Sequence, residues 1–151
     1  MILRSEKDLM LFYFGYKTFI NAADELIQSY GIGRQHHRFL FFICYYPGIH
    51  VSALLEILEI SKQGAQSALK VLKSRGLIIE KTNQNDKRLK ELHPTEAGLS
   101  LIESLCNAQL QLLNKIESEY GSNWTEMMKG LSAPRPGYQM IKEKRGIAWK
   151  K

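Results

Sequence analysis

The most informative part of the sequence is residues 61–98, SKQGAQSALKVLKSRGLIIEKTNQNDKRLKELHPTEAG, because its hydrophobic periodicity changes along its length. In its first part apolar residues recur every three or four positions, which is the spacing of one helix face. We expect a helix over residues 61–75, with Ser61 as its N-cap and Gly76 at its end. The expected buried face consists of Ala65, Ala68, Leu69 and Leu72.

The pattern that follows is that of two short strands. The segment LIIEK is β-branched and is preceded by a glycine, which is typical of a strand, and TNQNDK has the Asn and Asp content of a hairpin tip. The segment RLKELH returns as the second strand. Residues 77–93 are therefore predicted to form a hairpin, after which Thr95 is the expected N-cap of a long helix.

The rest of the chain is predicted to be helical, in a single domain of residues 1–151. Ser5 and Asp8 have the spacing of a capping pair that opens the first helix. The tail contains two prolines and an excess of basic side chains, so we expect it to be irregular. The expected segments are a first helix at 5–31, a helix-turn-helix with its hairpin at 34–93, further helices at 95–133 and an irregular basic tail at 134–151.

The first helix and the long helix after the hairpin each carry apolar residues on more than one side. A helix with one apolar stripe packs on its own domain, whereas two stripes require a second contact surface. We therefore expect both helices to pack on a second chain as well as on their own domain. The residues predicted to lie in this interface are Leu9, Phe12, Tyr16, Leu113, Ile116 and Tyr120.

Composition limits the classes of function. The formal net charge of +6 favours polyanionic partners, without deciding between DNA, RNA and an anionic membrane surface. No uncharged apolar run has the length of a transmembrane helix. The two cysteines, Cys44 and Cys106, are far apart and lack metal-ligand spacing, so we expect a reduced protein in the cytoplasm.

Catalytic motifs are missing from the sequence. It contains no glycine-rich phosphate loop, no nucleophile elbow and no pair of carboxylates with a nearby base. We therefore expect neither an enzyme nor a protein with a bound cofactor or metal ion.

The outward face of the helix at 61–75 carries side chains that suit DNA. Glutamine can pair with adenine through two hydrogen bonds, serine can serve several bases, and lysine can contact guanine or phosphate. A solvated helix face would have a similar composition, and the helix alone does not decide between these two interpretations. The candidate contact residues are Ser61, Lys62, Gln63, Gln66, Ser67 and Lys70.

The order of the predicted elements brings a resemblance to a known family. The segments HHRFLFFICYYPG, HVSALLEILEISKQ, LKSRGLI and DKRLKELHPTEAG resemble the MarR family of winged helix-turn-helix transcriptional regulators. In the last segment Asp86, Arg88, Thr95 and Gly98 stand in register with the family pattern. The resemblance implies a mainly α fold with a small β-hairpin wing, in which a winged helix-turn-helix DNA-binding domain is flanked by N- and C-terminal dimerisation helices.

The resemblance also implies roles for individual residues. Arg88 of the wing would enter the minor groove of double-stranded DNA, and Asp86 would brace the wing through Arg88 or through an amide of the tip. Lys87 and Lys90 would contact phosphates, although each could equally serve solubility. The family further implies a homodimeric repressor that binds a palindromic operator.

Two features depart from the family pattern. Gly64 occupies a position that commonly carries Thr or Ser, and its missing side chain allows close approach either to DNA or to the preceding helix. Ser67 stands where Arg is common, so we expect Gln63 and Gln66 to make the base contacts. The rival interpretation is a winged helix repurposed for protein or RNA interaction without operator-specific DNA binding.

The resemblance implies a small-molecule effector, often a phenolic compound, bound between the dimerisation and DNA-binding parts. The alternative is that the histidine pair at this helix start is structural or solvated. The apolar surroundings of Cys44 argue against a peroxide-sensing thiol. The candidate effector residues are His36, His37, Arg38 and Tyr45.

Overall fold

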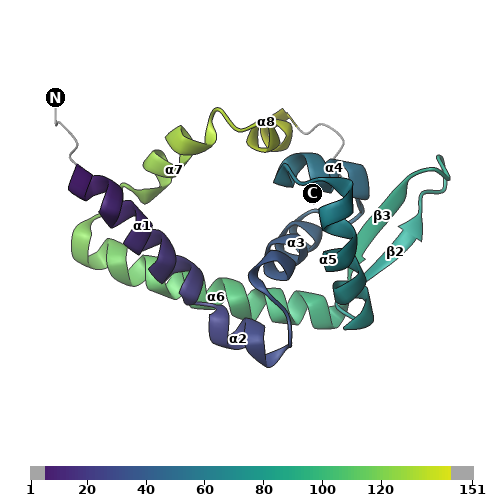
Figure 1. The fold of residues 1–151 in the computed structure, drawn as a ribbon, viewed down its shortest axis with the longest axis horizontal. Coiled ribbons are helices and arrows are strands. Elements are labelled where there is room, and N and C mark those ends of the chain that lie inside the picture. The colour runs from purple at the N-terminus through teal and green to yellow at the C-terminus, as the bar shows by residue number, and fades with distance from the viewer. Residues whose placement is uncertain (1–5, 144–151) are drawn as a thin grey trace.

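The computed structural model describes residues 6–143, and the expected cap Ser5 and residues 144–151 of the tail lie outside this range. Figure 1 shows how the elements are arranged. In chain order they are α1 (Glu6–Asn21), α2 (Asp24–Ser29), α3 (Arg34–Tyr45), β1 (Ile49–His50), α4 (Val51–Leu58), α5 (Lys62–Ser74), β2 (Ile78–Thr82), β3 (Lys90–Pro94), α6 (Glu96–Tyr120), α7 (Trp124–Ser132) and α8 (Pro136–Glu143).

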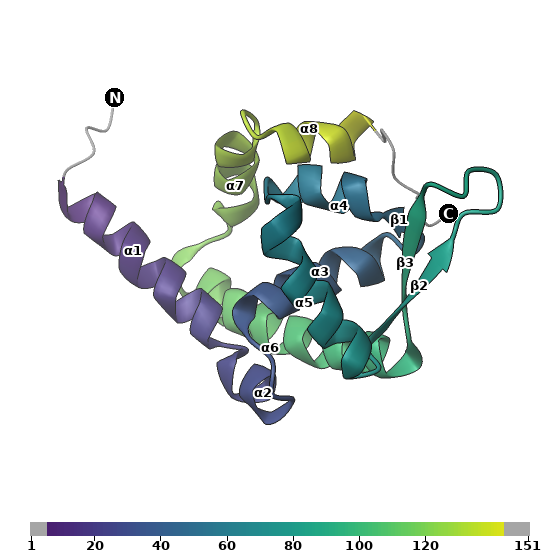
Figure 2. The same ribbon diagram turned by 45° about the vertical axis from the view of Figure 1, so that its right-hand side comes forward.

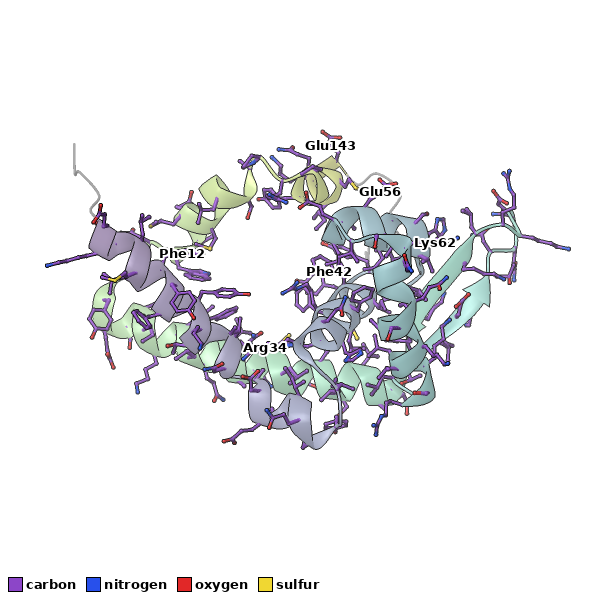
Figure 3. The ribbon with its side chains drawn as sticks, in the orientation of Figure 1. Phe12, Arg34, Phe42, Glu56, Lys62 and Glu143 are labelled. Carbon is purple, nitrogen blue, oxygen red and sulfur yellow. The ribbon has the colours of Figure 1, made fainter. Side chains whose placement is uncertain are left out.

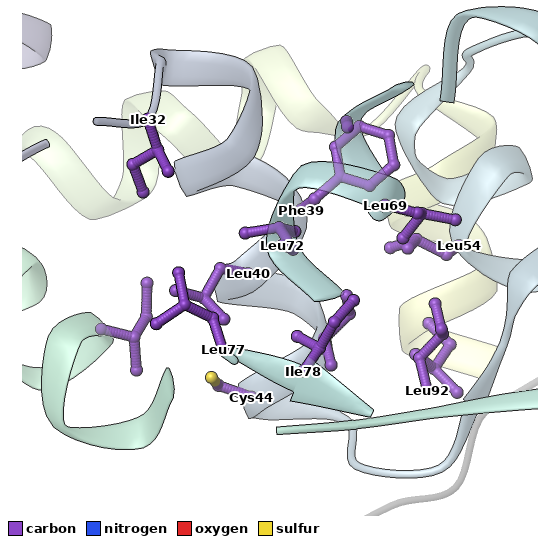
Figure 4. Close-up of a cluster of buried hydrophobic side chains, with 14 of the residues drawn as sticks. Ile32, Phe39, Leu40, Cys44, Leu54, Leu69, Leu72, Leu77, Ile78 and Leu92 are labelled. Carbon is purple, nitrogen blue, oxygen red and sulfur yellow. The ribbon is translucent and has the colours of Figure 1, made fainter. Parts of the chain in front are cut away.

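The hydrophobic core lies where α3, α4 and α5 pack on the small sheet (Figure 4). Leu40 of α3, Leu54 of α4, Leu72 of α5 and Leu92 of β3 are completely buried. Burial of one such side chain contributes about 1.5–3 kcal/mol relative to its exposure to water. These contacts therefore hold the two helices of the helix-turn-helix and the base of the wing as one unit.

The sheet is antiparallel with strand order β1-β3-β2. The hairpin of β2 and β3 was predicted, and it projects away from the helices in both ribbon views (Figures 1 and 2). The strand β1 was not predicted, and it pairs Ile49 with Leu92 and His50 with Glu91. A strand of two residues is too short to show a period of two in the sequence, which explains why it was missed.

The long helix α6 begins as the sequence predicted. The hydroxyl of Thr95 accepts a hydrogen bond from the N–H of Gly98 at 3.0 Å, which caps the helix. A Cβ atom at Gly98 would lie 2.1 Å from the carbonyl oxygen of Leu77, so only glycine fits at this crossing of α6 and the start of the wing. From there α6 extends beneath α3 towards α1 (Figure 2).

The expectation of one helix over 5–31 is wrong, because the chain turns at Ala22–Ala23 and forms α1 and α2. The turn directs α2 towards the core, where Ala23 and Ile27 are buried. None of the described residues of α1 is buried, and much of its apolar surface is exposed. Figure 3 shows Phe12 on this helix, far from the wing.

The expectation of an irregular tail from residue 134 is also wrong for the described part, since residues 136–143 form α8. Pro136 is the first residue of this helix, a position where the missing N–H of proline has no cost. The helix lies along α4 in both ribbon views (Figures 1 and 2). The two prolines therefore mark the start of a short helix and not the end of ordered structure.

Candidate nucleic-acid interface

The helix α5 presents one polar face to solvent. Its N-cap is Ser61 as predicted, and the hydroxyl accepts a hydrogen bond from the N–H of Gly64 at 3.3 Å. The four residues expected on the inner face are all buried. Two amides, two hydroxyls and two ammonium groups on the outer face can bind base edges and phosphates. The predicted contact residues, all of which are exposed, are Ser61, Lys62, Gln63, Gln66, Ser67 and Lys70.

The fold of the chain does not require a glycine at position 64. A Cβ atom there would lie 3.4 Å from the Oγ atom of Ser61 and 3.6 Å from the Cγ2 atom of Ile60, which are ordinary van der Waals contacts. Close approach to the preceding segment therefore does not explain this glycine. Close approach to DNA stays a prediction.

The wing tip holds Arg88 through a carboxylate. The Nε and Nη2 atoms of Arg88 donate to the two carboxylate oxygens of Asp86, each at 3.0 Å, and the backbone N–H of Arg88 donates to Oδ1 as well. These hydrogen bonds, led by that of the Arg88 side chain, hold the pKa of Asp86 below its ordinary value. The side chain of Arg88 nevertheless remains 90% exposed, so its guanidinium is held in a fixed orientation and accessible at the end of the hairpin.

The turn beneath Arg88 is ordered by Asn83. Its Oδ1 atom accepts hydrogen bonds from the N–H groups of Asn85 at 2.9 Å and of Asp86 at 2.8 Å, and its Nδ2 atom donates to Glu91 at 2.5 Å. An asparagine that bonds to the backbone two and three residues ahead is a common way to close a turn. Asn83 was not among the predicted site residues, although TNQNDK was predicted to be a hairpin tip.

A groove of about 620 Å³ lies between the α4–α5 unit and the wing. Residues of α5, the expected recognition helix, meet residues of the wing in this groove although they are distant in sequence. Figure 3 shows Lys62 at the start of α5, on the side where the wing projects. Glu80 is its one acidic lining residue among those the structure describes, and it is paired with Lys73. The cationic lining residues are Lys62, Lys70, Lys73, Arg88 and Lys90.

The groove separates the predicted site residues into two groups. Gln66 lines it together with two of the predicted lysines of α5, with Arg88 and with Lys90, whose Nζ atom donates to Thr82 at 3.0 Å. The other candidates do not line the groove and are Ser61, Gln63, Ser67, Asp86 and Lys87. Sequence reasoning missed the contributions of His50 and Ser52, which depend on the position of β1 next to β3.

A second cavity, of about 580 Å³, lies between α1, α3 and α6. Its wall is mostly aromatic and aliphatic, and Arg34, His37, Arg38 and Gln109 add charged or polar side chains. Arg34 is paired with Asp24 at 2.7 Å, whereas the ion pairs among residues 6–143 do not include Arg38. The cavity thus combines an apolar wall with an unpaired guanidinium.

Three of the four predicted effector residues line this cavity, namely His37, Arg38 and Tyr45. His36 does not line it, because its Nδ1 atom accepts the backbone N–H of Gly33 at 2.8 Å and so caps α3. His36 thus makes a structural contact at the start of α3. Burial lowers the pKa of both histidines, which favours the neutral imidazole that such an acceptor needs.

The cavity also contains residues to which the sequence assigned other roles. Tyr16 and Leu113, predicted to lie in the dimer interface, line it, and so does Cys106 of α6. Burial raises the pKa of the Cys106 thiol, which disfavours the reactive thiolate.

Residues 6–143 contain no group of three His, Cys, Asp or Glu side chains placed to hold a metal ion. No helix in this range could cross a membrane.

A helix-turn-helix followed by a hairpin, with recognition helix and wing facing one cationic groove, defines a winged-helix DNA-binding protein. Comparison with known proteins agrees with this class. Residues 30–89 match the MarR family. The HTH-type transcriptional regulator PetP of Rhodobacter capsulatus is 29% identical over 143 residues, which cover 91% of this chain and 86% of PetP.

Solved structures share the fold. The S. aureus MepR–DNA complex has a TM-score of 0.61 at 18% identity, and the match covers 81% of this chain and 98% of that one. NadR in complex with 4-hydroxyphenylacetate has a TM-score of 0.69 at 19% identity, covering 88% and 96%. Residues 30–89, which contain the helix-turn-helix and most of the wing, are thus of MarR type, and the protein is a MarR-type DNA-binding transcriptional regulator and not an enzyme, as the sequence predicted.

Proposed function

We propose that the protein is a homodimeric repressor that binds a palindromic operator and is released from it by an aromatic effector. The observation that carries the DNA-binding part is the groove between α5 and the wing. Lys62 and Lys70 line it without an ion pair among the described residues, and Arg88 enters from the other side. Cations on both walls suit a duplex whose phosphates flank the groove that α5 reads.

The proposed dimer rests on the exposed apolar surface of α1. Between Leu9 and Tyr16 seven large apolar side chains are 48–71% exposed, and Tyr120 at the end of α6 is 80% exposed. A monomeric protein rarely exposes a contiguous apolar patch of this kind. A second copy of the chain is the simplest partner, because a two-fold axis pairs the same patch with itself. Such a dimer would set its recognition helices about 34 Å apart, one turn of DNA.

Selection of bound duplexes from a random pool tests operator binding, palindromy and half-site spacing together. We expect enriched sites with two inverted half-sites whose centres lie about one turn apart, bound about 10³-fold or more tightly than random duplex. Light scattering on the free protein should give twice the mass of the chain. Enrichment of a single half-site by a monomer would contradict the proposal.

The rival proposal, a winged helix repurposed for protein or RNA interaction, makes the opposite prediction for the same pool. It expects no enriched duplex and equal, salt-sensitive affinity for all sequences, because only phosphate contacts would remain. The paired amides of Gln63 and Gln66 on the exposed face of α5 favour the operator-binding proposal, since amides serve base edges better than phosphates.

For the effector we propose an aromatic carboxylate in the cavity between α1, α3 and α6. Its volume of about 580 Å³ lies within the range of small-molecule pockets. The rings of Phe41 and Tyr45 are stacked with centroids 5.4 Å apart and supply an aromatic wall, while Arg38 supplies an unpaired cation. NadR, which shares the fold, was solved with 4-hydroxyphenylacetate.

Titration with 4-hydroxyphenylacetate tests this proposal, with the neutral 4-hydroxyphenylacetamide as the matched control ligand. We expect calorimetric binding of the acid and not of the amide, and a loss of acid binding in the variant Arg38→Gln. The variant Lys129→Gln removes a charge on α7, outside the cavity, and should bind like the parent. Equal binding of acid and amide would contradict a role for Arg38.

A further inference from the structure

The helix α8 touches the backbone of α4 directly. A Cβ atom at Gly137 would lie 2.1 Å from the carbonyl oxygen and 2.9 Å from the Cα atom of Ile57, so no larger residue fits without moving α8. Met140 and Ile141 then pack against the core from the same helix. The C-terminal segment is thus seated on the first helix of the helix-turn-helix (Figure 2).

A second contact lies one residue before α8. The guanidinium of Arg135 forms an ion pair with Glu59, and its Nε atom donates to Oε2 at 2.9 Å. Glu59 is the C-cap of α4 and has a φ of 54°, the one positive φ of a non-glycine residue among residues 6–143. A residue with a Cβ atom rarely adopts this left-handed conformation, so external contacts help to hold it.

The segment that Arg135 contacts is the turn that orients the recognition helix. Glu59, Ile60 and Ser61 are the residues between α4 and α5, and the N–H of Ile60 bonds back to the carbonyl of Leu55 at 3.1 Å. A change of backbone angles in so short a connection rotates α5 relative to α4. The contacts from the C-terminal segment therefore bear on the angle at which α5 meets DNA.

Gln139 orders the connection between α7 and α8 that carries Arg135. The side chain of Gln139 donates to the carbonyl of Ala133 at 2.6 Å, and its backbone N–H donates to the carbonyl of Arg135 at 3.1 Å. These two hydrogen bonds link the connection between α7 and α8 to the first turn of α8. Arg135 is thus fixed to the same helix that Gly137 seats on α4.

We propose that α8 is a brace of the helix-turn-helix, in which Arg135 and Gly137 hold the Glu59 turn and thereby fix the orientation of α5. Both are positioning residues that act on DNA binding through the turn. The DNA-binding consequence rests on the operator-binding function proposed above, whereas the brace itself can be measured without DNA.

Hydrogen exchange of the free protein tests the brace. The variant Arg135→Gln should speed exchange at the backbone amides of Glu59 to Ser61 by about twofold to fivefold, the range that a surface ion pair can contribute. The matched control Lys129→Gln breaks the ion pair of Lys129 with Glu126 on α7 and should leave these amides unchanged. Equal exchange in the two variants would overturn the role of Arg135.

A second pair of variants tests the helix contact. Gly137→Ala should speed exchange in the same turn by about tenfold or more, because α8 must move off α4. Gly130→Ala is the control, since a Cβ atom at Gly130 on α7 meets nothing within 4 Å. Unaltered exchange in the turn of Gly137→Ala would show that α8 does not hold it and would overturn the proposal.

Operator binding then gives the functional consequence. Arg135→Gln should weaken binding about twofold to fivefold with an unchanged salt slope, whereas loss of a phosphate contact would lower the slope by about one unit. The double variant Glu59→Arg with Arg135→Glu should restore affinity. If Arg135→Gln lowers the salt slope and the double variant does not restore affinity, the positioning role of Arg135 is overturned. If the parent selects no duplex, the operator-binding function fails, while the exchange data still decide the brace.

Discussion

Replacing Arg88 by alanine should weaken operator binding while leaving the fold intact. The side chain is 90% exposed, and its two hydrogen bonds go to Asp86 within the same turn. The backbone N–H of Arg88 keeps its own bond to Asp86 in the variant, and Asn83 still closes the turn. Because an exposed ion pair contributes little to folding, we expect Tm to change by no more than about 2 °C.

The effect on DNA binding should be much larger. Insertion of a guanidinium into a narrow minor groove uses its charge and its planar shape, and both are lost in alanine. A dimer carries two wings, so a loss of about threefold to tenfold at each wing multiplies to about tenfold to a hundredfold for the complex. The slope of log K against log salt should also fall, by about one unit for each lost contact.

Fluorescence anisotropy of a labelled operator at several salt concentrations measures both quantities. Arg88→Lys is the matched variant, since it keeps the charge and should retain the salt slope while it loses part of the affinity. Parent affinity in Arg88→Ala, with an unchanged slope, would refute the reasoning and place the wing outside the interface.

Three further changes have separate outcomes. Gln66→Ala should relax sequence preference more than it lowers affinity, as read by selection from a random pool, and a uniform loss over all sequences would make Gln66 a backbone contact. Gly64→Ala should stabilise the fold by about 0.5–1 kcal/mol in urea unfolding, because the site has room for a methyl group, yet weaken operator binding if DNA approaches the backbone there. Phe12→Asp should shift light scattering towards the monomer mass, and an unchanged dimer would exclude α1 from the interface.

Stability should fall as the pH drops through the range in which histidine titrates. Burial lowers the folded-state pKa of His37, so protonation favours the unfolded state once the pH is below the ordinary value of about 6.5. The stability that neutral His37 contributes is present in full above a pH of about 6.5, and it declines as the pH falls from there towards the folded-state pKa. Thermal unfolding at about pH 7.5 and about pH 5.5 should show a smaller drop in Tm for His37→Gln than for the parent. An equal drop would assign the pH dependence to other groups.

Local chemistry made much of the fold predictable. The caps Ser61 and Thr95 each bond to an N–H three residues ahead, and such contacts depend only on nearby residues. The buried face of α5 and the hairpin follow from spacings of three to four and of two. The class of protein was predicted because a helix-turn-helix, a hairpin and a long helix follow one another in this order along the chain.

Neighbouring residues with the same chemistry show where local reasoning fails. His36 and His37 were equivalent candidates, yet the first caps α3 and the second lines the cavity. Which of the two faces the cavity depends on how α3 lies against α1 and α6. That arrangement results from packing over many buried side chains, and no short segment encodes it.

Sequence alone was enough to predict α5 with its cap and its cationic polar face, the hairpin, and the cap of α6, because each depends on hydrogen bonds and spacings within a few residues. Tertiary packing was needed to place Gly137 of α8 against Ile57, to bring Arg135 to Glu59, and to turn Lys70 and Arg88 towards one groove. These pairs are distant in the chain and meet only when the core is packed, since close packing allows few relative positions of the elements.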